Sequence, residues 1–130
     1  MPGLNQQLGR QIEGFLDKIR PGISWERANW GLSRSPELNQ HPERRLPRLD
    51  AAVTLGEVWL RIELQSLVAL PRSQGILFGI RLEIHRLAEV KQDVAAAERL
   101  CRALATMPDD MARYKNLAAA RSTIIRLLSR

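Results

Sequence analysis

The sequence is short of the residue types that most often mark metal, redox or disulfide sites. Its 130 residues include one cysteine, Cys101, and two histidines, His41 and His85, which lie far apart in the chain. One cysteine cannot form an internal disulfide or a cysteine-based metal site, and an isolated histidine is more often a surface residue than a ligand. We therefore expect no metal centre built from clustered side chains.

Standard catalytic and nucleotide-binding motifs are also missing. The chain contains no G-x-G-x-x-G, P-loop, H-E-x-x-H or G-x-S-x-G sequence, which disfavours the protein classes that depend on them. No apolar run approaches the roughly 18 residues that a membrane span needs. The first residues, MPGLNQQLGRQ, lack the charged and apolar regions of a signal peptide. We expect a cytoplasmic protein without a membrane partner.

The remaining composition is that of a globular protein. Apolar residues make up 45% of the chain and charged residues 26%, with a net charge of +6, and this length suits a single domain over residues 1–130 with its own core. The positive charge favours acidic partners. The arginines are scattered, however, and no recognition-helix pattern accompanies them, so we expect no specific binding of nucleic acid.

The most regular pattern lies between Val58 and Ile84. Two apolar-rich segments alternate with period two around the connection Pro71–Gly75, which predicts an antiparallel hairpin. If this connection is symmetric, Gln65 lies opposite Arg81 and the polar residues of both strands share one face. The other face is then expected to be buried, and its central residues are Leu60, Ile62, Phe78 and Ile80.

The rest of the chain predicts helices and one further strand. Helical spacing of apolar residues indicates a helix over 4–19, and ISWERANWGL over 23–32 is typical of a strand. A proline-rich loop is expected over 33–50. After about Leu87 the pattern becomes helical, and Asp93 is the predicted N-cap of the first long helix. A short helix is expected to begin within residues 106–109, and a last helix is expected over 117–128. Three strands covered by helices make an α+β fold.

The polar residues of the hairpin have two interpretations. They are Arg61, Glu63, Gln65, Arg81, Glu83 and His85. A solvated sheet face is common in antiparallel sheets, whereas converging arginine and carboxylate groups are typical of a ligand pocket. Tyr114 is similarly open to a proton-donor or a packing role, and the three tryptophans to ligand stacking or to packing.

Five segments resemble one known family. They are Arg27–Trp30 (RANW), Leu60–Leu67 (LRIELQSL), Leu70–Ser73 (LPRS), Leu77–Arg81 (LFGIR) and Met111–Leu117 (MARYKNL). They are similar to the R-x-N-W, L-R-V-E-R-Q-T-L-x-x-L-P-R-S, L-F-T-I-R-T-Y and M-x-x-Y-K-G-L segments of the haem-dependent oxidative N-demethylases, the type of the dimethylamine monooxygenase catalytic subunit. The resemblance covers that family's C-terminal half. Leu64 and Glu83 replace an arginine and a tyrosine, and an I-H-x-P-V-P segment of the family has no counterpart.

The resemblance implies a PAS-like fold that binds haem b. It implies oxidative demethylation of a small secondary amine by O₂, with electrons from NADPH delivered by a flavin and iron–sulfur reductase partner. Transferred to this chain, the catalytic positions are Arg61, Arg81 and Glu83, and the cofactor-binding positions are Trp30, Gln65 and His85. The chain is expected to be either a truncated relative of this family or a separate piece that needs a partner. The alternative is a non-catalytic PAS-like module that binds a ligand or a protein partner.

Overall fold

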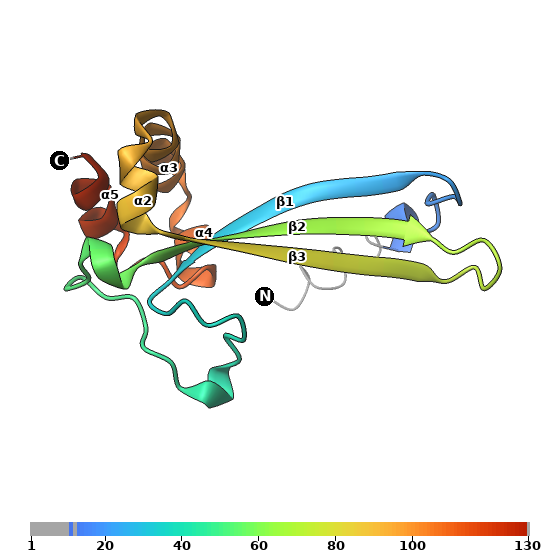
Figure 1. The fold of residues 1–130 in the computed structure, drawn as a ribbon, viewed down its shortest axis with the longest axis horizontal. Helices are drawn as coiled ribbons and strands as arrows, with labels where there is room; N and C mark the ends of the chain where they lie inside the picture. The colour runs from blue at the N-terminus through green and yellow to red at the C-terminus, as the bar shows by residue number, and fades with distance from the viewer. Residues whose placement is uncertain (1–10, 12, 130) are drawn as a thin grey trace. The chain divides into compact units, whose positions relative to one another are not determined.

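The computed structural model describes residues 11 and 13–129, and Figure 1 shows their secondary structure. The elements are β1 (Ser24–Ser33), the 3₁₀ helices η1 (Pro42–Arg44) and η2 (Leu55–Glu57), β2 (Trp59–Ala69), β3 (Ile76–Arg86), α2 (Leu87–Gln92), α3 (Val94–Thr106), α4 (Asp109–Tyr114) and α5 (Arg121–Ser129). One antiparallel sheet in the order β1-β2-β3 precedes a run of helices, so the α+β prediction is confirmed. Half of the expected helix over 4–19 lies outside the described residues; of the other half, residues 11 and 13–16 are helical and residues 17–19 are not.

The chain divides into two compact units. One comprises Met1–Asn29 and Leu64–Arg81, and we call it the hairpin unit. The other comprises Trp30–Glu63 and Leu82–Arg130, and we call it the helical unit. No helix in the described part of the chain is long and apolar enough to cross a membrane.

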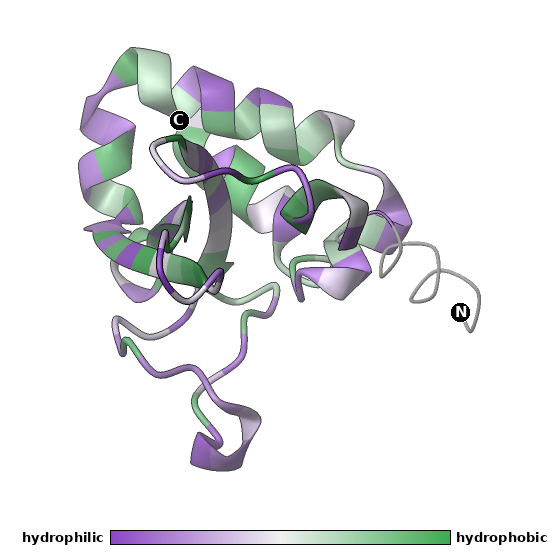
Figure 2. Cartoon of the chain, turned by 90° about the vertical axis from the view of Figure 1, so that its right-hand side faces the viewer, coloured by the Kyte–Doolittle hydropathy of each residue, from purple (hydrophilic) through white to green (hydrophobic). Residues whose placement is uncertain are grey.

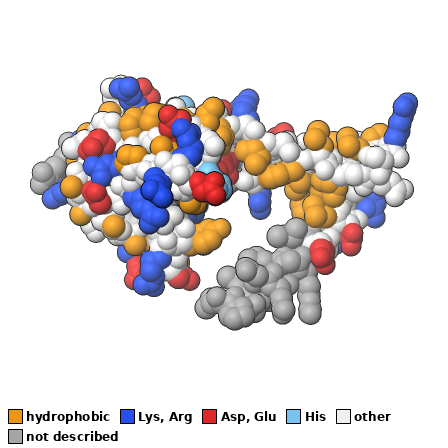
Figure 3. All heavy atoms as spheres, turned by 90° about the horizontal axis from the view of Figure 1, so that it is seen from below, with side chains coloured by type: hydrophobic (Ala, Val, Ile, Leu, Met, Phe, Trp, Pro, Cys, Tyr) orange, Lys and Arg blue, Asp and Glu red, His pale blue; other side chains and the backbone are white. Residues whose placement is uncertain are grey.

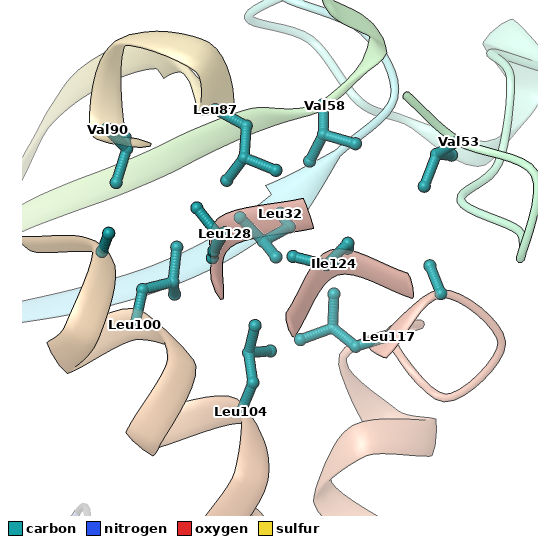
Figure 4. Packing of buried hydrophobic residues seen from close by; sticks show 12 residues of the cluster. Leu32, Val53, Val58, Leu87, Val90, Leu100, Leu104, Leu117, Ile124 and Leu128 are labelled. Atoms are coloured by element: carbon teal, nitrogen blue, oxygen red, sulfur yellow. The ribbon is translucent and has the colours of Figure 1, made fainter. Parts of the chain in front are cut away.

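The helical unit has a continuous apolar core (Figure 4). Its buried residues are Leu32, Val53, Val58, Leu87, Val90, Ala97, Leu100, Leu104, Leu117, Ala120, Ile124 and Leu128. Helices α3 and α5 pack against each other because each carries an apolar stripe at helical spacing. The predicted N-cap is confirmed, since the Asp93 carboxylate accepts the Ala96 N–H at 3.0 Å.

The boundaries of the last helices differ slightly from the prediction. Helix α4 ends at Tyr114, and Asn116 adopts a left-handed backbone with φ of 57°, which separates it from the next helix as expected. A turn then precedes α5, which begins at Arg121 rather than Leu117. Leu117 and Ala120 in this turn are completely buried, so the apolar residues assigned to the helix belong to the core although some of them are not helical.

The hairpin exists, but its register differs from the predicted one. The Leu70 N–H donates to the Gly75 carbonyl at 2.8 Å, and a Cβ on Gly79 would lie 2.9 Å from Ser66 Oγ. These contacts place Leu70 opposite Gly75 and Ser66 opposite Gly79, so that Gln65 lies opposite Ile80. The connection between the strands has six residues, 70–75, and not five. A shift of one residue moves every side chain of one strand to the other face.

The helical unit has the same register. There the Leu87 N–H donates to the Val58 carbonyl at 2.9 Å, which places Arg61 opposite Ile84 and His85 opposite Leu60. Each face of the hairpin therefore combines the polar row of one strand with the apolar row of the other. Figure 2 shows hydrophilic and hydrophobic residues alternating along the strands.

This register explains an error in the predicted core. Phe78 and Ile80 are 48% and 53% exposed, although burial was expected, and Leu60 and Ile62 are only half-buried. In the hairpin unit, Ile80 lies beside the polar row of β2 rather than on a wholly apolar face. The buried apolar residues described in that unit are Ile19 and Ala69.

Candidate functional site

Two resemblance segments meet in the hairpin unit through Arg27 and Gln65. The Arg27 Nε donates to the Gln65 Oε1 at 2.6 Å, across 38 residues of sequence. Strands β1 and β2 are neighbours in the sheet, so these two side chains lie on one face. Gln65 is 9% exposed, and a buried amide oxygen needs a donor to replace water. A charged guanidinium donor makes a strong hydrogen bond, so Arg27 fixes the orientation of the Gln65 amide.

The Arg27–Trp30 segment also meets the Met111–Leu117 segment, in the helical unit, through Trp30 and Lys115. The Lys115 ammonium donates to the Trp30 carbonyl at 2.6 Å and lies 5.3 Å from the centroid of the Trp30 ring. A cation at this distance is attracted by the face of the indole. One face of Trp30 is therefore engaged by Lys115. The adjacent Tyr114 is 82% exposed, so packing does not explain its presence.

Arg61 holds a loop of the helical unit. Its two terminal nitrogens donate to the carbonyl oxygens of Glu37 and Leu38 at 2.9 and 3.0 Å. Both acceptors belong to the proline-rich segment between β1 and β2, which has few backbone hydrogen bonds of its own. The guanidinium fork suits two acceptors side by side. In this structure Arg61 therefore orders the loop.

Glu83 and His85 are neighbours on β3 in the helical unit. The Glu83 Oε2 lies 3.8 Å from the His85 Nε2, and the two side chains are 40% and 46% exposed. The register places both residues on the face of Leu60 and Ile62, whereas Arg61 points to the opposite face. The structure brings Glu83 and His85 together but does not bring Arg61 to them.

The same separation holds in the hairpin unit. Gln65 shares a face with Ile80, and Arg81 shares the other face with Leu64, because Ser66 lies opposite Gly79. Arg81 is exposed. The expected meeting of Gln65 and Arg81 on a common polar face is therefore wrong, and its cause is the six-residue connection.

An ion-pair cluster around Arg34 was not predicted. The Arg34 guanidinium donates to the Asp50 Oδ2 at 2.6 Å and to the Glu57 Oε1 at 3.0 Å. The Glu57 Oε2 accepts the Thr54 N–H and hydroxyl at 3.0 and 2.9 Å. The hydrogen bond from Arg34, then those from Thr54, lower the pKa of the Glu57 carboxyl, and the hydrogen bond to Glu57 raises the pKa of Arg34. The sequence signal was the capping box Thr54-x-x-Glu57 at the start of η2.

The residues present can be compared with what a haem group needs. No group of three or more histidine, cysteine or acidic residues that could hold a metal ion occurs among the described residues. A haem iron, however, needs only one axial side chain from the protein, which is often a histidine whose second nitrogen faces a carboxylate. His85 offers an accessible imidazole, and Glu83 lies beside one of its nitrogens. The donor set of the chain therefore fits a haem.

A comparison with protein families agrees with the segments described above. The model of the family described as haem-dependent oxidative N-demethylase, alpha subunit-like, matches residues 1–125 of the 130-residue chain. The match includes Arg27, Gln65, Trp30 and Lys115, the residues whose short contacts join distant segments. On this match, the chain belongs to the family of haem-dependent oxidative N-demethylase alpha subunit-like proteins.

Proposed function

We propose that this chain is the haem-binding domain of an oxidative N-demethylase. It binds haem b within a PAS-like fold that extends over residues 1–130, and it oxidises a small secondary amine in the cytoplasm. A flavin and iron–sulfur reductase partner supplies the electrons. The observation that carries the proposal is the family match over residues 1–125.

His85 is the residue that we propose to hold the haem iron, with Glu83 orienting its imidazole. The support is the 3.8 Å approach of the Glu83 carboxylate to the His85 Nε2 and the accessibility of both side chains. A carboxylate beside a metal-bound histidine orients its ring. When bound, the haem supplies the activation of O₂. Glu83 is also the carboxylate beside His85 that we assign to the catalytic positions.

Arginine residues have two different tasks in this proposal. Arg81 is exposed on the hairpin unit, and its guanidinium suits the carboxylate of a haem propionate. Arg61 acts by positioning, because its hydrogen bonds to the Glu37 and Leu38 carbonyls order the loop before β2.

Trp30 and Gln65 are the other two residues assigned to cofactor binding. Trp30 would present to a planar ligand only the ring face that Lys115 does not engage, and Gln65 acts through the amide orientation set by Arg27.

A haem titration followed by absorption spectroscopy tests this function. The parent protein is expected to give a Soret band that saturates at one haem per chain. His85→Ala should shift or abolish the band, whereas His41→Ala, which changes an exposed histidine, should leave it unchanged. Arg81→Leu is expected to weaken haem binding without loss of stability. A parent protein that shows no saturable band contradicts the proposal.

The alternative is a non-catalytic PAS-like module. The observation that favours it is that Arg61 is occupied by backbone carbonyls and is separated by the sheet from Glu83 and His85. Such a module would bind its ligand or partner without turnover. Reduction of the haem-loaded protein followed by addition of dimethylamine and O₂ distinguishes the two, because only the enzyme would release formaldehyde.

A further inference from the structure

The hairpin unit leaves large apolar side chains in contact with solvent. On β3 these are Ile76, Leu77, Phe78 and Ile80, which are 36–57% exposed. Figure 3 shows hydrophobic side chains at the surface of this part of the sheet. A soluble protein rarely exposes apolar residues in a contiguous group unless the group forms an interface. The stretch is therefore a candidate interaction surface.

The same stretch is an unprotected sheet edge. Strand β3 is the outer strand in the order β1-β2-β3, and no strand of the described residues pairs with its far side. Edge strands usually carry a charge, a lysine or a proline that prevents pairing with another chain. The sequence Ile76–Ile80, ILFGI, contains none of these. With respect to the described residues, its outer backbone groups therefore suit sheet extension.

The direction of the free backbone groups follows from the hairpin register. Gly75 and Leu87, which flank β3, bond through their main chains to Leu70 and Val58, which flank β2. In an antiparallel pair every second residue directs its N–H and C=O to the neighbouring strand. The odd-numbered residues of β3 therefore face β2, and Ile76, Phe78 and Ile80 direct their N–H and C=O away from it.

We propose that this edge pairs with the same edge of a second copy of the chain. The two β3 strands run antiparallel about a two-fold axis at Phe78, so that each Phe78 lies opposite its counterpart and exchanges two backbone hydrogen bonds with it. Ile76 then lies opposite Ile80. The outward-facing backbone groups of both strands meet in this register, which an isologous interface requires.

The side chains of this register are self-complementary. Leu77 lies opposite Gly79, so a large side chain meets the position that has none. Ile76, Phe78 and Ile80 of both copies form one apolar row across the axis, and aromatic and branched cross-strand pairs of this kind stabilise a sheet. No charged residue falls inside the paired stretch, and Arg81 lies opposite Gly75 rather than opposite a second arginine.

The exposed area indicates a dissociable dimer. The four apolar side chains are about half exposed and leave on the order of 400 Å² of apolar surface. A standard interface buries about 800 Å² on each partner, so the dimer belongs to the smaller class. The dimer proposal does not depend on haem, and its test is independent of the proposed enzymatic function.

Disulfide trapping tests the register. In a Cys101→Ser background, Phe78→Cys is expected to form a covalent dimer under mild oxidation, because paired residues have Cα atoms about 5.5 Å apart. Ile80→Cys alone should form no covalent dimer, since the two substituted positions of the paired strands would be separated by about 13 Å along the strands. A mixture of Ile76→Cys and Ile80→Cys proteins should form the cross-linked heterodimer. Equal cross-linking of Ile80→Cys and Phe78→Cys would overturn the proposal.

Sedimentation equilibrium tests the association itself. The parent protein should show a concentration-dependent dimer, and Phe78→Lys should raise the dissociation constant roughly tenfold or more because it places two like charges at the axis. Val94→Lys changes a side chain on α3 that is 69% exposed and should leave the constant unaltered. A parent protein that stays monomeric at every concentration, or is dissociated equally by both substitutions, contradicts the proposed interface.

Discussion

At the scale of single residues, the contact between Arg27 and Gln65 deserves measurement because the acceptor is buried. Replacing Arg27 with Met removes the donor at 2.6 Å, and such a loss at a buried polar group costs about 1–3 kcal/mol. We expect that range for Arg27→Met in urea denaturation. Arg72→Met, at an exposed position in the hairpin connection, should change the free energy of unfolding by less than about 0.5 kcal/mol.

A double-mutant cycle tests whether the effect belongs to this pair. Gln65→Met removes the acceptor, so the combined variant should be less destabilised than the sum of the two single variants. Additive effects would show that Arg27 stabilises the hairpin unit through other contacts.

Glu57 gives a prediction for the pH dependence of stability. Its folded-state pKa is lowered, chiefly by the hydrogen bond from Arg34. A lowered pKa means that the carboxylate stabilises the folded state above its unfolded pKa, about 4.3, and that this contribution is lost as the pH falls through the folded value. Glu57→Gln should therefore be less stable than the parent at pH 7, and the difference should shrink below about pH 4.

The control for the pH experiment is a carboxylate outside the cluster. Glu98 is exposed on α3, so Glu98→Gln should track the parent protein over the same pH range. A stability difference for Glu57→Gln that stays constant from pH 7 to pH 3 would contradict the role given to Arg34.

At the scale of elements, the hairpin register determines which apolar residues stabilise the fold. Phe78 is 48% exposed, so we expect Phe78→Ala to cost about 1 kcal/mol or less in dilute protein, instead of the roughly 3–5 kcal/mol of a core phenylalanine. Leu104 is completely buried between the helices, and Leu104→Ala should cost about 2–5 kcal/mol. Denaturant midpoints of the two variants show which substitution destabilises the protein more. A larger loss of stability for Phe78→Ala than for Leu104→Ala would contradict the exposed position of Phe78.

The elements themselves could be predicted from the sequence, because period-two and helical spacing identify strands and helices directly. Their pairing could not. The apparent connection Pro71–Gly75 suggested an odd number of residues, but Leu70 also belongs to it, and this one residue reverses the face of every β3 side chain. The side-chain contacts of the candidate site could not be predicted for a related reason. The contacts that organise it join residues 38 and 85 positions apart, and local patterns carry no information about such distances.

At the scale of the whole molecule, the two units should differ in local stability. The helical unit contains the continuous core, whereas the hairpin unit buries Ile19 and Ala69 among its described apolar residues. Backbone amides protected by a core exchange only through unfolding that costs a large free energy. Amides of strands with little buried apolar surface exchange through local opening that costs a small free energy. Hydrogen exchange in dilute protein should therefore be slower in α3 and α5 than in residues 64–81. Equal protection in both would contradict this division.

The core of the helical unit also has a consequence for synthesis. Leu32 packs in one cluster with Ile124 and Leu128. The Trp30 carbonyl accepts a hydrogen bond from the ammonium of Lys115, which is synthesised 85 residues later. A ribosome adds about 5–20 residues each second. Strand β1 therefore emerges several seconds before α5, whose side chains pack against Leu32 in the core. During this interval Leu32 and Val58 have no native core to enter. Folding of this unit is consequently a late event that follows the emergence of α5, and the nascent chain before that point is a natural substrate for chaperones.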